Sequence, residues 1–242
     1  MNPERLLLTA ARVSTFEGSR ACTSASGFFF ERDARLYLVT GRHVLIDAPT
    51  SHFPDRVEIE IHLDAGNLAR STGFSMLLYA AGRAVWRQAS DEGGEIDVAV
   101  LEIDREALPT GAVFEAFGPQ HLVPPGEPVE VGTSLLIVGF PMGFHDTLHH
   151  LPVVRQAILA TAYGLRFKGA GYFLTDARTH RGTSGAPVVC RSADGTLADL
   201  PWRLLGVHSA RLDVGHREAA IDEALGLNCT WYADILLTLT EA

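Results

Sequence analysis

Three short segments of the sequence carry side chains that can cooperate in nucleophilic catalysis. Ser184 lies between glycines in the segment 181–187, Arg-Gly-Thr-Ser-Gly-Ala-Pro. His43 ends the segment Thr-Gly-Arg-His, and Asp97 begins the run Asp-Val-Ala-Val-Leu. A serine hydroxyl is a weak nucleophile at neutral pH and needs an adjacent base, such as an imidazole that a carboxylate orients. The three residues together therefore predict acyl-transfer chemistry at Ser184.

The glycines beside Ser184 predict a tight turn that exposes the hydroxyl, because glycine takes left-handed backbone conformations without steric cost. Such a turn can direct the amides of Gly182 and Ser184 at one point, with Thr183 close by. Converging amides stabilise the negative oxygen that forms when a carbonyl is attacked. We therefore take Gly182, Thr183 and Ser184 as the candidate oxyanion hole.

Each segment also has a simpler interpretation. The segment around Ser184 is by itself an ordinary Gly/Ser/Pro surface turn. A lone His43 is a buried histidine at the end of a strand, and a lone Asp97 is a turn residue after two glycines. Only the three segments together favour catalysis over these alternatives.

The order histidine, aspartate, serine distinguishes among enzymes that use these residues. α/β-Hydrolases run serine, aspartate, histidine, and subtilisins run aspartate, histidine, serine. The hydrolase turn also requires glycine two residues after the serine, where this chain has Ala186. In contrast, the segments 40–44, 96–100 and 182–187 resemble the trypsin-like (chymotrypsin-fold) serine peptidases, especially the bacterial branch near the HtrA and glutamyl endopeptidase groups. The resemblance implies a catalytic triad of His43, Asp97 and Ser184, a protein or peptide substrate, and no cofactor or metal.

The resemblance also suggests which residues line the S1 pocket, the pocket for the substrate residue before the scissile bond. The segment 205–210, Leu-Gly-Val-His-Ser-Ala, resembles the family's S1 strand, and glutamyl endopeptidases have a histidine and a threonine where this chain has His208 and Thr179. These side chains can donate hydrogen bonds to a carboxylate or amide, which predicts cleavage after Glu, or after Gln. The alternative is that His208 is structural and bonds to backbone. The candidate S1 residues are Thr179, His208, Ser209 and Arg211.

Two charged residues bear on this pocket. Trypsins have an aspartate six residues before the serine, where this chain has Arg178, so cleavage after Lys or Arg is disfavoured. Arg211 stands where the family more often has glycine, so it either adds positive charge or narrows the pocket.

Short segments separated by turn residues predict an all-β chain. Residues 57–63, Val-Glu-Ile-Glu-Ile-His-Leu, alternate strictly, which is typical of a half-buried strand. Turn signals are expected at 18–19 and 24–27. Further strands are expected at 6–15, 27–39 (as a hairpin), 74–80, 84–88, 98–103, 134–140, 153–163, 172–176, 186–190 and 203–210.

The strand pattern indicates an antiparallel barrel or sandwich in the first half. The resemblance implies two antiparallel six-stranded β-barrels and a short C-terminal helix, for which 231–241 has helical spacing. Residues 104–127 are rich in Pro, Gly and polar groups and form the expected linker. We predict an N-terminal barrel over 1–115, with His43 and Asp97, and a C-terminal barrel over 116–242, with Ser184 and the S1 pocket.

Composition limits the compartment and partners. The 242 residues have a formal net charge of -9 and no basic run, which argues against a general nucleic-acid binder. No stretch is long enough to span a membrane. The apolar run 6–8 is too short for a signal peptide, and three cysteines cannot all pair, so we expect a cytoplasmic protein. Pairing of Cys190 with Cys229 stays open.

Three rival functions remain. The cluster His-Asp-Thr-Leu-His-His at 145–150 could bind Zn²⁺, although a solvated loop is the alternative that we favour. A catalytically silent trypsin-fold module would use the same cleft only to bind peptides, and an esterase would share the activated serine. Activation by a regulatory protein partner, or by ordering of the 178–183 loop, is left open.

Overall fold

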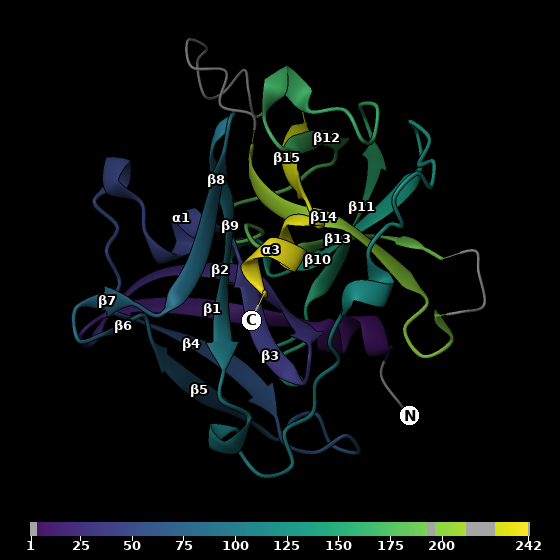
Figure 1. Cartoon of the computed structure of the whole chain (residues 1–242). Coiled ribbons are helices and arrows are strands. Elements are labelled where there is room, and N and C mark those ends of the chain that lie inside the picture. Colours follow the sequence, from purple (N-terminus) through teal and green to yellow (C-terminus); the bar gives the residue numbers. More distant parts are fainter. Residues whose placement is uncertain (1–3, 193–196, 212–225, 242) are drawn as a thin grey trace.

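Two β units pack side by side in the computed structural model of the chain, which describes residues 4–192, 197–211 and 226–241 (Figure 1). The first half forms a seven-stranded antiparallel sheet, and the second half forms a closed barrel of six strands. The all-β prediction is therefore confirmed. The prediction of two closed six-stranded barrels is not, because only the second unit closes.

The seven-stranded sheet has the strand order β5-β4-β1-β2-β3-β9-β8, and a separate hairpin pairs β6 with β7. A short 3-10 helix, η1 (Arg5–Thr9), precedes β1, where a strand was expected from residue 6. The elements are β1 (Ala10–Glu17), β2 (Arg20–Arg32), β3 (Arg35–Thr40), α1 (Arg42–Leu45), η2 (Ala48–Thr50), β4 (Arg56–His62), β5 (Ser71–Leu77), β6 (Tyr79–Ala80), β7 (Arg83–Ala84), β8 (Trp86–Asp91), β9 (Gly94–Ile103) and η3 (Arg105–Ala107).

This first unit is open because the chain leaves the ladder after β5. It turns through Ala81 and Gly82, both with positive φ, and pairs Tyr79–Ala80 with Arg83–Ala84. Within residues 4–192, β5 consequently pairs only with β4, and β8 pairs only with β9. The predicted alternation of β4 is confirmed up to Ile61, since Val57, Ile59 and Ile61 are buried and alternate with half-exposed polar residues, whereas His62 at the end of the strand is also buried.

The six strands of the barrel follow the order β10-β11-β12-β15-β14-β13. The expected helix 231–241 is shorter, because Trp231 and Tyr232 end β15, which closes the barrel between β12 and β14. The remaining elements are η4 (Pro119–His121), β10 (Ser134–Gly139), η5 (Pro141–Gly143), β11 (Val153–Leu159), η6 (Phe167–Gly169), β12 (Tyr172–Asp176), β13 (Pro187–Arg191), β14 (Trp202–Arg211), β15 (Leu227–Tyr232) and α3 (Ile235–Leu239).

A shared apolar core joins the two units. Phe28 and Val100 of the sheet belong to the same buried cluster as Val138 and Leu204 of the barrel. The helix α3, which follows the barrel, packs on β8 and β9 of the sheet, as Figure 1 shows near the C-terminus. Because burial of apolar surface is favourable in proportion to its area, this shared core stabilises the junction of the two units.

The chain crosses between the units over a few residues. Phe117 still bonds to the sheet, donating to the Phe29 carbonyl and accepting from the Glu31 amide. Leu122 forms a parallel bridge with Leu204 of the barrel. The predicted boundary between residues 115 and 116 lies just before this crossing and stays a prediction.

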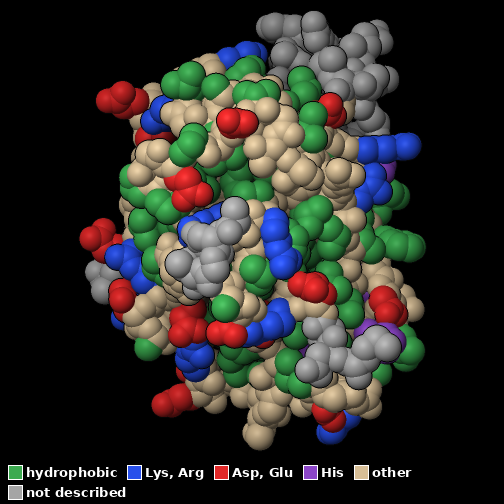
Figure 2. All heavy atoms as spheres, turned by 90° about the vertical axis from the view of Figure 1, so that its right-hand side faces the viewer, with side chains coloured by type: hydrophobic (Ala, Val, Ile, Leu, Met, Phe, Trp, Pro, Cys, Tyr) green, Lys and Arg blue, Asp and Glu red, His purple; other side chains and the backbone are tan. Residues whose placement is uncertain are grey.

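Acidic and basic side chains are interspersed over the face that Figure 2 shows. All three cysteines lie in the described part of the chain, and Cys22, Cys190 and Cys229 are free thiols. Among the described residues, no helix has the length and apolar character needed to cross a bilayer.

Candidate active site

His43 and Asp97 form a tightly bonded pair on the first β unit. His43 lies on α1, directly after β3, and Asp97 lies in the adjacent strand β9. The His43 Nδ1 atom is 2.7 Å from Asp97 Oδ2, and the His43 backbone amide donates to Asp97 Oδ1 at 2.8 Å. A carboxylate can only accept, so Nδ1 carries the proton and Nε2 of the neutral ring is left as an acceptor.

The environment sets opposite pKa shifts on the two partners. Burial disfavours the charged imidazole, but the hydrogen bond and the charge of Asp97 outweigh it and raise the pKa of His43. Burial likewise disfavours the carboxylate, yet hydrogen bonds from His43 and Ser209 lower the pKa of Asp97. Asp97 is therefore ionised near neutral pH, as a group that orients an imidazole must be.

Ser209 joins the barrel to this pair. Its hydroxyl donates a short hydrogen bond to Asp97 Oδ2 from strand β14, across the junction of the two units. We expected Ser209 in the S1 pocket, but its hydroxyl is directed to Asp97. The sequence offers no local signal for this contact, because the two residues are 112 positions apart.

The turn that carries Ser184 requires two of its glycines. Gly182 has a φ of 90°, and a Cβ there would lie 2.6 Å from the Phe140 carbonyl oxygen. Gly185 has a φ of 86°, and a Cβ there would overlap the Ser26 carbonyl oxygen and lie 2.9 Å from the Gly41 amide nitrogen. The backbone approaches its neighbours so closely that no side chain fits, as the glycine pattern predicted.

Ser26 of β2 anchors this turn to the first unit. Its amide donates to the Ser184 carbonyl at 2.9 Å, and its hydroxyl donates to the Gly182 carbonyl at 2.7 Å and accepts from the Phe140 amide at 2.9 Å. The side chain is fully buried. Sequence reasoning missed this residue, because the polar segment 24–27 predicts a turn, whereas the structure makes it part of β2.

One backbone hydrogen bond holds the peptide before Gly182. The Met142 amide donates to the Arg181 carbonyl at 2.5 Å. The N–H of a trans peptide points opposite to its C=O, so the Gly182 amide is directed away from Met142. Within the described residues, the Gly182 and Ser184 amides donate to no acceptor, whereas the Thr183 amide donates to His180 at 3.2 Å.

Gly41 is in contact with both the serine turn and the His43 ring. Gly41 packs against the turn at Gly185, and its Cβ position lies 3.0 Å from His43 Cε1. Among the described residues, no hydrogen bond joins the Ser184 hydroxyl to His43. Such contacts are often long without substrate and shorten when substrate binds.

The candidate S1 residues lie behind the turn, between β12, β14 and β15. Thr179, His208 and Ser209 are all buried. The Thr179 hydroxyl donates to Asn228 Oδ1 at 2.5 Å, and the Asn228 amide donates to the carbonyls of Ala177 and Gly226. The sequence interpretation did not include Asn228, although an asparagine between Leu227 and Cys229 in a strand-like segment is a signal that the sequence shows. The Arg211 backbone pairs with Asn228, but its side chain lies outside the described part of the structure.

The histidine cluster at 145–150 forms internal contacts. His149 Nδ1 is 2.6 Å from Asp146 Oδ2, and the rings of His145 and His150 stack at 5.7 Å. Over the described residues, no group of three or more His, Cys, Asp and Glu side chains converges as metal ligands.

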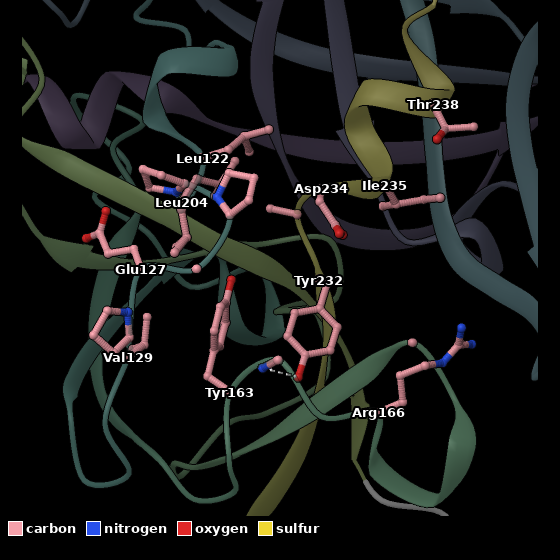
Figure 3. A pocket seen from close by; sticks show the side chains of 18 of the residues that line it. Leu122, Glu127, Val129, Tyr163, Arg166, Leu204, Tyr232, Asp234, Ile235 and Thr238 are labelled. Carbon is pink, nitrogen blue, oxygen red and sulfur yellow. Dashed lines mark hydrogen bonds between the residues drawn. The ribbon is translucent and has the colours of Figure 1, made fainter.

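One cavity of the described structure is separate from these groups. It has a volume of about 780 Å³ and lies between the linker, the barrel and the end of β8, with Ile96 as its nearest contact to Asp97. Figure 3 shows Tyr163 and Tyr232 on one wall and Asp234 and Ile235 beside them. None of the candidate catalytic residues lines this cavity. We therefore place the candidate active site at the His43–Asp97 pair and not in the cavity.

These features define a class of protein. A β-barrel packs against a second β unit, a histidine–aspartate pair lies on one unit, and a serine turn framed by glycines on the other unit packs against Gly41, two residues before that histidine. This is the arrangement of a trypsin-like serine peptidase.

Comparison with known proteins agrees with this class. A family model described as "Trypsin-like peptidase domain" matches residues 25–197, most of the chain. The chain therefore belongs to the trypsin-like peptidases, a family of serine endopeptidases. None of the curated proteins compared with the chain matches it.

Two solved structures are similar to the chain at low sequence identity. The serine endoprotease from Yersinia pestis matches with a TM-score of 0.54 and 17% identity, over 97% of this chain and 62% of that protein. An inactive form of Rv3671c from M. tuberculosis H37Rv matches with a TM-score of 0.49 and 14% identity, over 99% of this chain and 92% of that one. The likeness to the Yersinia protein supports the fold.

Proposed function

We propose that this chain hydrolyses peptide bonds, with Ser184 as the nucleophile, His43 as the general base and Asp97 as the group that orients His43. The observation that carries the proposal is the pair of hydrogen bonds from His43 to Asp97, at 2.7 and 2.8 Å, beside the turn of Ser184. That pair leaves Nε2 of His43 unprotonated, which a base for a serine hydroxyl requires.

The reaction follows from these positions. His43 Nε2 takes the Ser184 proton as Oγ bonds to the substrate carbonyl carbon, and the amides of Gly182 and Ser184 stabilise the oxyanion. His43 then gives the proton to the leaving nitrogen as the C–N bond breaks, which leaves an acyl-enzyme. A water molecule gives its proton to His43 and attacks the acyl carbon, and return of the proton to Ser184 Oγ releases the acid.

A fluorophosphonate probe tests the nucleophile directly, because covalent labelling requires an activated serine. We expect labelling of the wild type and of Ser24→Ala, which removes an exposed serine, and none of Ser184→Ala. Wild-type labelling or hydrolysis by Ser184→Ala would refute the assignment. The silent peptide-binding module predicts no labelling of any variant. An esterase predicts labelling without peptide cleavage.

We further propose cleavage after Glu, with Gln as second choice. Thr179 and His208 are buried polar side chains behind the serine turn, and such groups bind a polar side chain better than an apolar one. Accepting a carboxylate requires the Thr179 hydroxyl to rotate away from Asn228 Oδ1, which accepts its hydrogen bond in this structure. Digestion of a proteome-derived peptide library measures this preference, and cleavage mainly after Lys, Arg or large aromatic residues would refute it.

A further inference from the structure

The cavity between the linker, the barrel and the end of β8 has the dimensions of a ligand site. Its volume of about 780 Å³ lies within the range of about 300–1,000 Å³ that small-molecule pockets occupy. Pro124, Pro125 and Pro128 form the linker side, and Tyr163 and Tyr232 form another side (Figure 3). These five rings have few rotatable bonds, so a ligand that packs on them orders few side chains as it binds.

The two tyrosines are held in place by ring packing and hydrogen bonds. Their ring centroids are 5.1 Å apart, and both rings pack on Phe173, at 5.3 and 5.1 Å. The Tyr163 hydroxyl donates to the Leu205 carbonyl at 3.3 Å, and the Tyr232 hydroxyl donates to the Leu165 carbonyl at 2.9 Å. Because both phenolic protons are used within the protein, the tyrosines offer a ligand only oxygen lone pairs and ring surface.

The charged residues around the cavity leave one carboxylate without a cation. Arg166 is the only basic residue among the described residues that line the cavity, and its Nη2 atom is 2.5 Å from Asp91 Oδ2. Those two charges neutralise each other. Asp234 forms no ion pair with any residue that the structure describes, and its side chain caps no amide of α3. The Asp234 carboxylate is therefore an acceptor that is open to a ligand.

Glu127 adds a second negative charge to the lining. Its carboxylate is 3.9 Å from the guanidinium of Arg203, which offsets that charge in part. Burial raises the pKa of the Tyr163 phenol, and the charges of Asp234 and Glu127 raise it further, so both carboxylates act on the tyrosine side of the cavity. A lining that offers acceptors, ring surface and negative charge suits a ligand that brings donors, apolar surface and positive charge.

We propose that this cavity binds an organic cation, an ammonium or guanidinium group carried on an apolar body. The cationic group pairs with Asp234, and the body packs on the rings of Tyr163, Tyr232 and the linker prolines. A cation over the face of an aromatic ring is attracted by the electrons of the ring, which adds to the ion pair. The inference does not depend on the proposed peptidase function, because none of the candidate catalytic residues lines the cavity.

Three probes that share one phenylbutyl body test the role of charge. At neutral pH 4-phenylbutylamine is cationic, 4-phenylbutanol is neutral and 4-phenylbutyrate is anionic. In calorimetric titrations of the full chain, we expect the amine to bind about tenfold more tightly than the alcohol, and the acid to bind most weakly. Asp234→Asn keeps the shape of the side chain and removes its charge. It should weaken binding of the amine about threefold to tenfold and leave binding of the alcohol unchanged.

A matched control separates the cavity from the overall charge of the protein. Asp199→Asn removes the same charge from a side chain that is 92% exposed and lies outside the cavity, and it should leave binding of the amine unchanged. Equal weakening by both variants would show that the amine responds only to the net charge of -9 and would overturn the proposal. Equal binding of amine and alcohol by the wild type would overturn it too.

Two blocked peptides distinguish a free amine from the side chain of a protein as the source of the cation. Acetyl-Pro-Arg-Pro-amide carries a guanidinium, and the same peptide with citrulline in place of arginine carries none. Tighter binding of the arginine peptide, lost in Asp234→Asn, assigns the cavity to a cationic side chain of a protein partner. Binding of the amine alone assigns it to a free small molecule. If neither cation binds more tightly than its neutral counterpart, the proposal is wrong.

Discussion

Replacing Ser26 with alanine tests whether the first β unit positions the serine turn. The Ser26 hydroxyl donates to the Gly182 carbonyl at 2.7 Å and accepts from the Phe140 amide at 2.9 Å, in a fully buried site. Alanine removes only this oxygen. The backbone bond from the Ser26 amide to the Ser184 carbonyl, at 2.9 Å, remains.

The expected loss of stability follows from the groups left behind. The amide of Phe140, a residue only 1% exposed, loses its acceptor, and an unsatisfied buried group costs about 1–3 kcal/mol. Gly182 is half-buried, so water can replace the hydroxyl at its carbonyl, and the loss of this bond adds about 0.5–1 kcal/mol. We expect the free energy of unfolding to fall by about 1.5–4 kcal/mol.

The same change should reduce turnover. Ser26 anchors the carbonyl of Gly182, whose amide is one of the two proposed oxyanion donors. Losing such a donor outright costs about 10²–10³ in kcat, so loosening it should cost about tenfold to hundredfold. KM should change by less than about threefold, because the substrate contacts remain.

Guanidinium unfolding and steady-state hydrolysis measure both effects. Ser24→Ala is the control, since Ser24 is an exposed serine two positions earlier on the same strand. The reasoning fails if Ser26→Ala unfolds within about 0.5 kcal/mol of wild type and keeps its kcat.

Four further outcomes follow from the site. Burial opposes protonation of His43, but Asp97 outweighs this effect and raises the pKa of His43. Only the neutral ring can accept a proton. We therefore expect kcat/KM to rise with pH through an apparent pKa above about 6.5. A pH–rate profile with an acid limb at or below that value would contradict this expectation. In a separate test, Asp97→Asn should lower kcat by about 10⁴. Ser209→Ala removes a hydrogen-bond donor to Asp97 and should lower kcat by about tenfold in the same assay. The reason is that hydrogen bonds to charged groups are worth about 1.5–3 kcal/mol. Unchanged turnover would show that this hydrogen bond is dispensable. Gly185→Ala places a Cβ on Ser26 at a φ of 86° and should cost more than about 2 kcal/mol, measured by thermal unfolding; an unchanged Tm would refute the steric argument.

The sequence predicted the features that depend on local residue type and spacing. The strict alternation of residues 57–63 indicated β4, because a strand directs successive side chains to opposite faces. The glycines at 182 and 185 indicated a left-handed turn around Ser184. The candidate residues His43 and Asp97 came from residue type and chain order, and the structure brings them within hydrogen-bonding distance.

The tertiary structure decided what depends on distant partners. Ser26 bonds to Gly182 across 156 positions and Ser209 bonds to Asp97 across 112, and no local pattern records either pair. Closure of the second unit but not the first depends on which strands meet at the sheet edges, and the short helix α3 reflects the use of Trp231 in β15. Local spacing fixes how one segment folds, whereas hydrogen-bond partners and sheet closure depend on the packing of the whole chain.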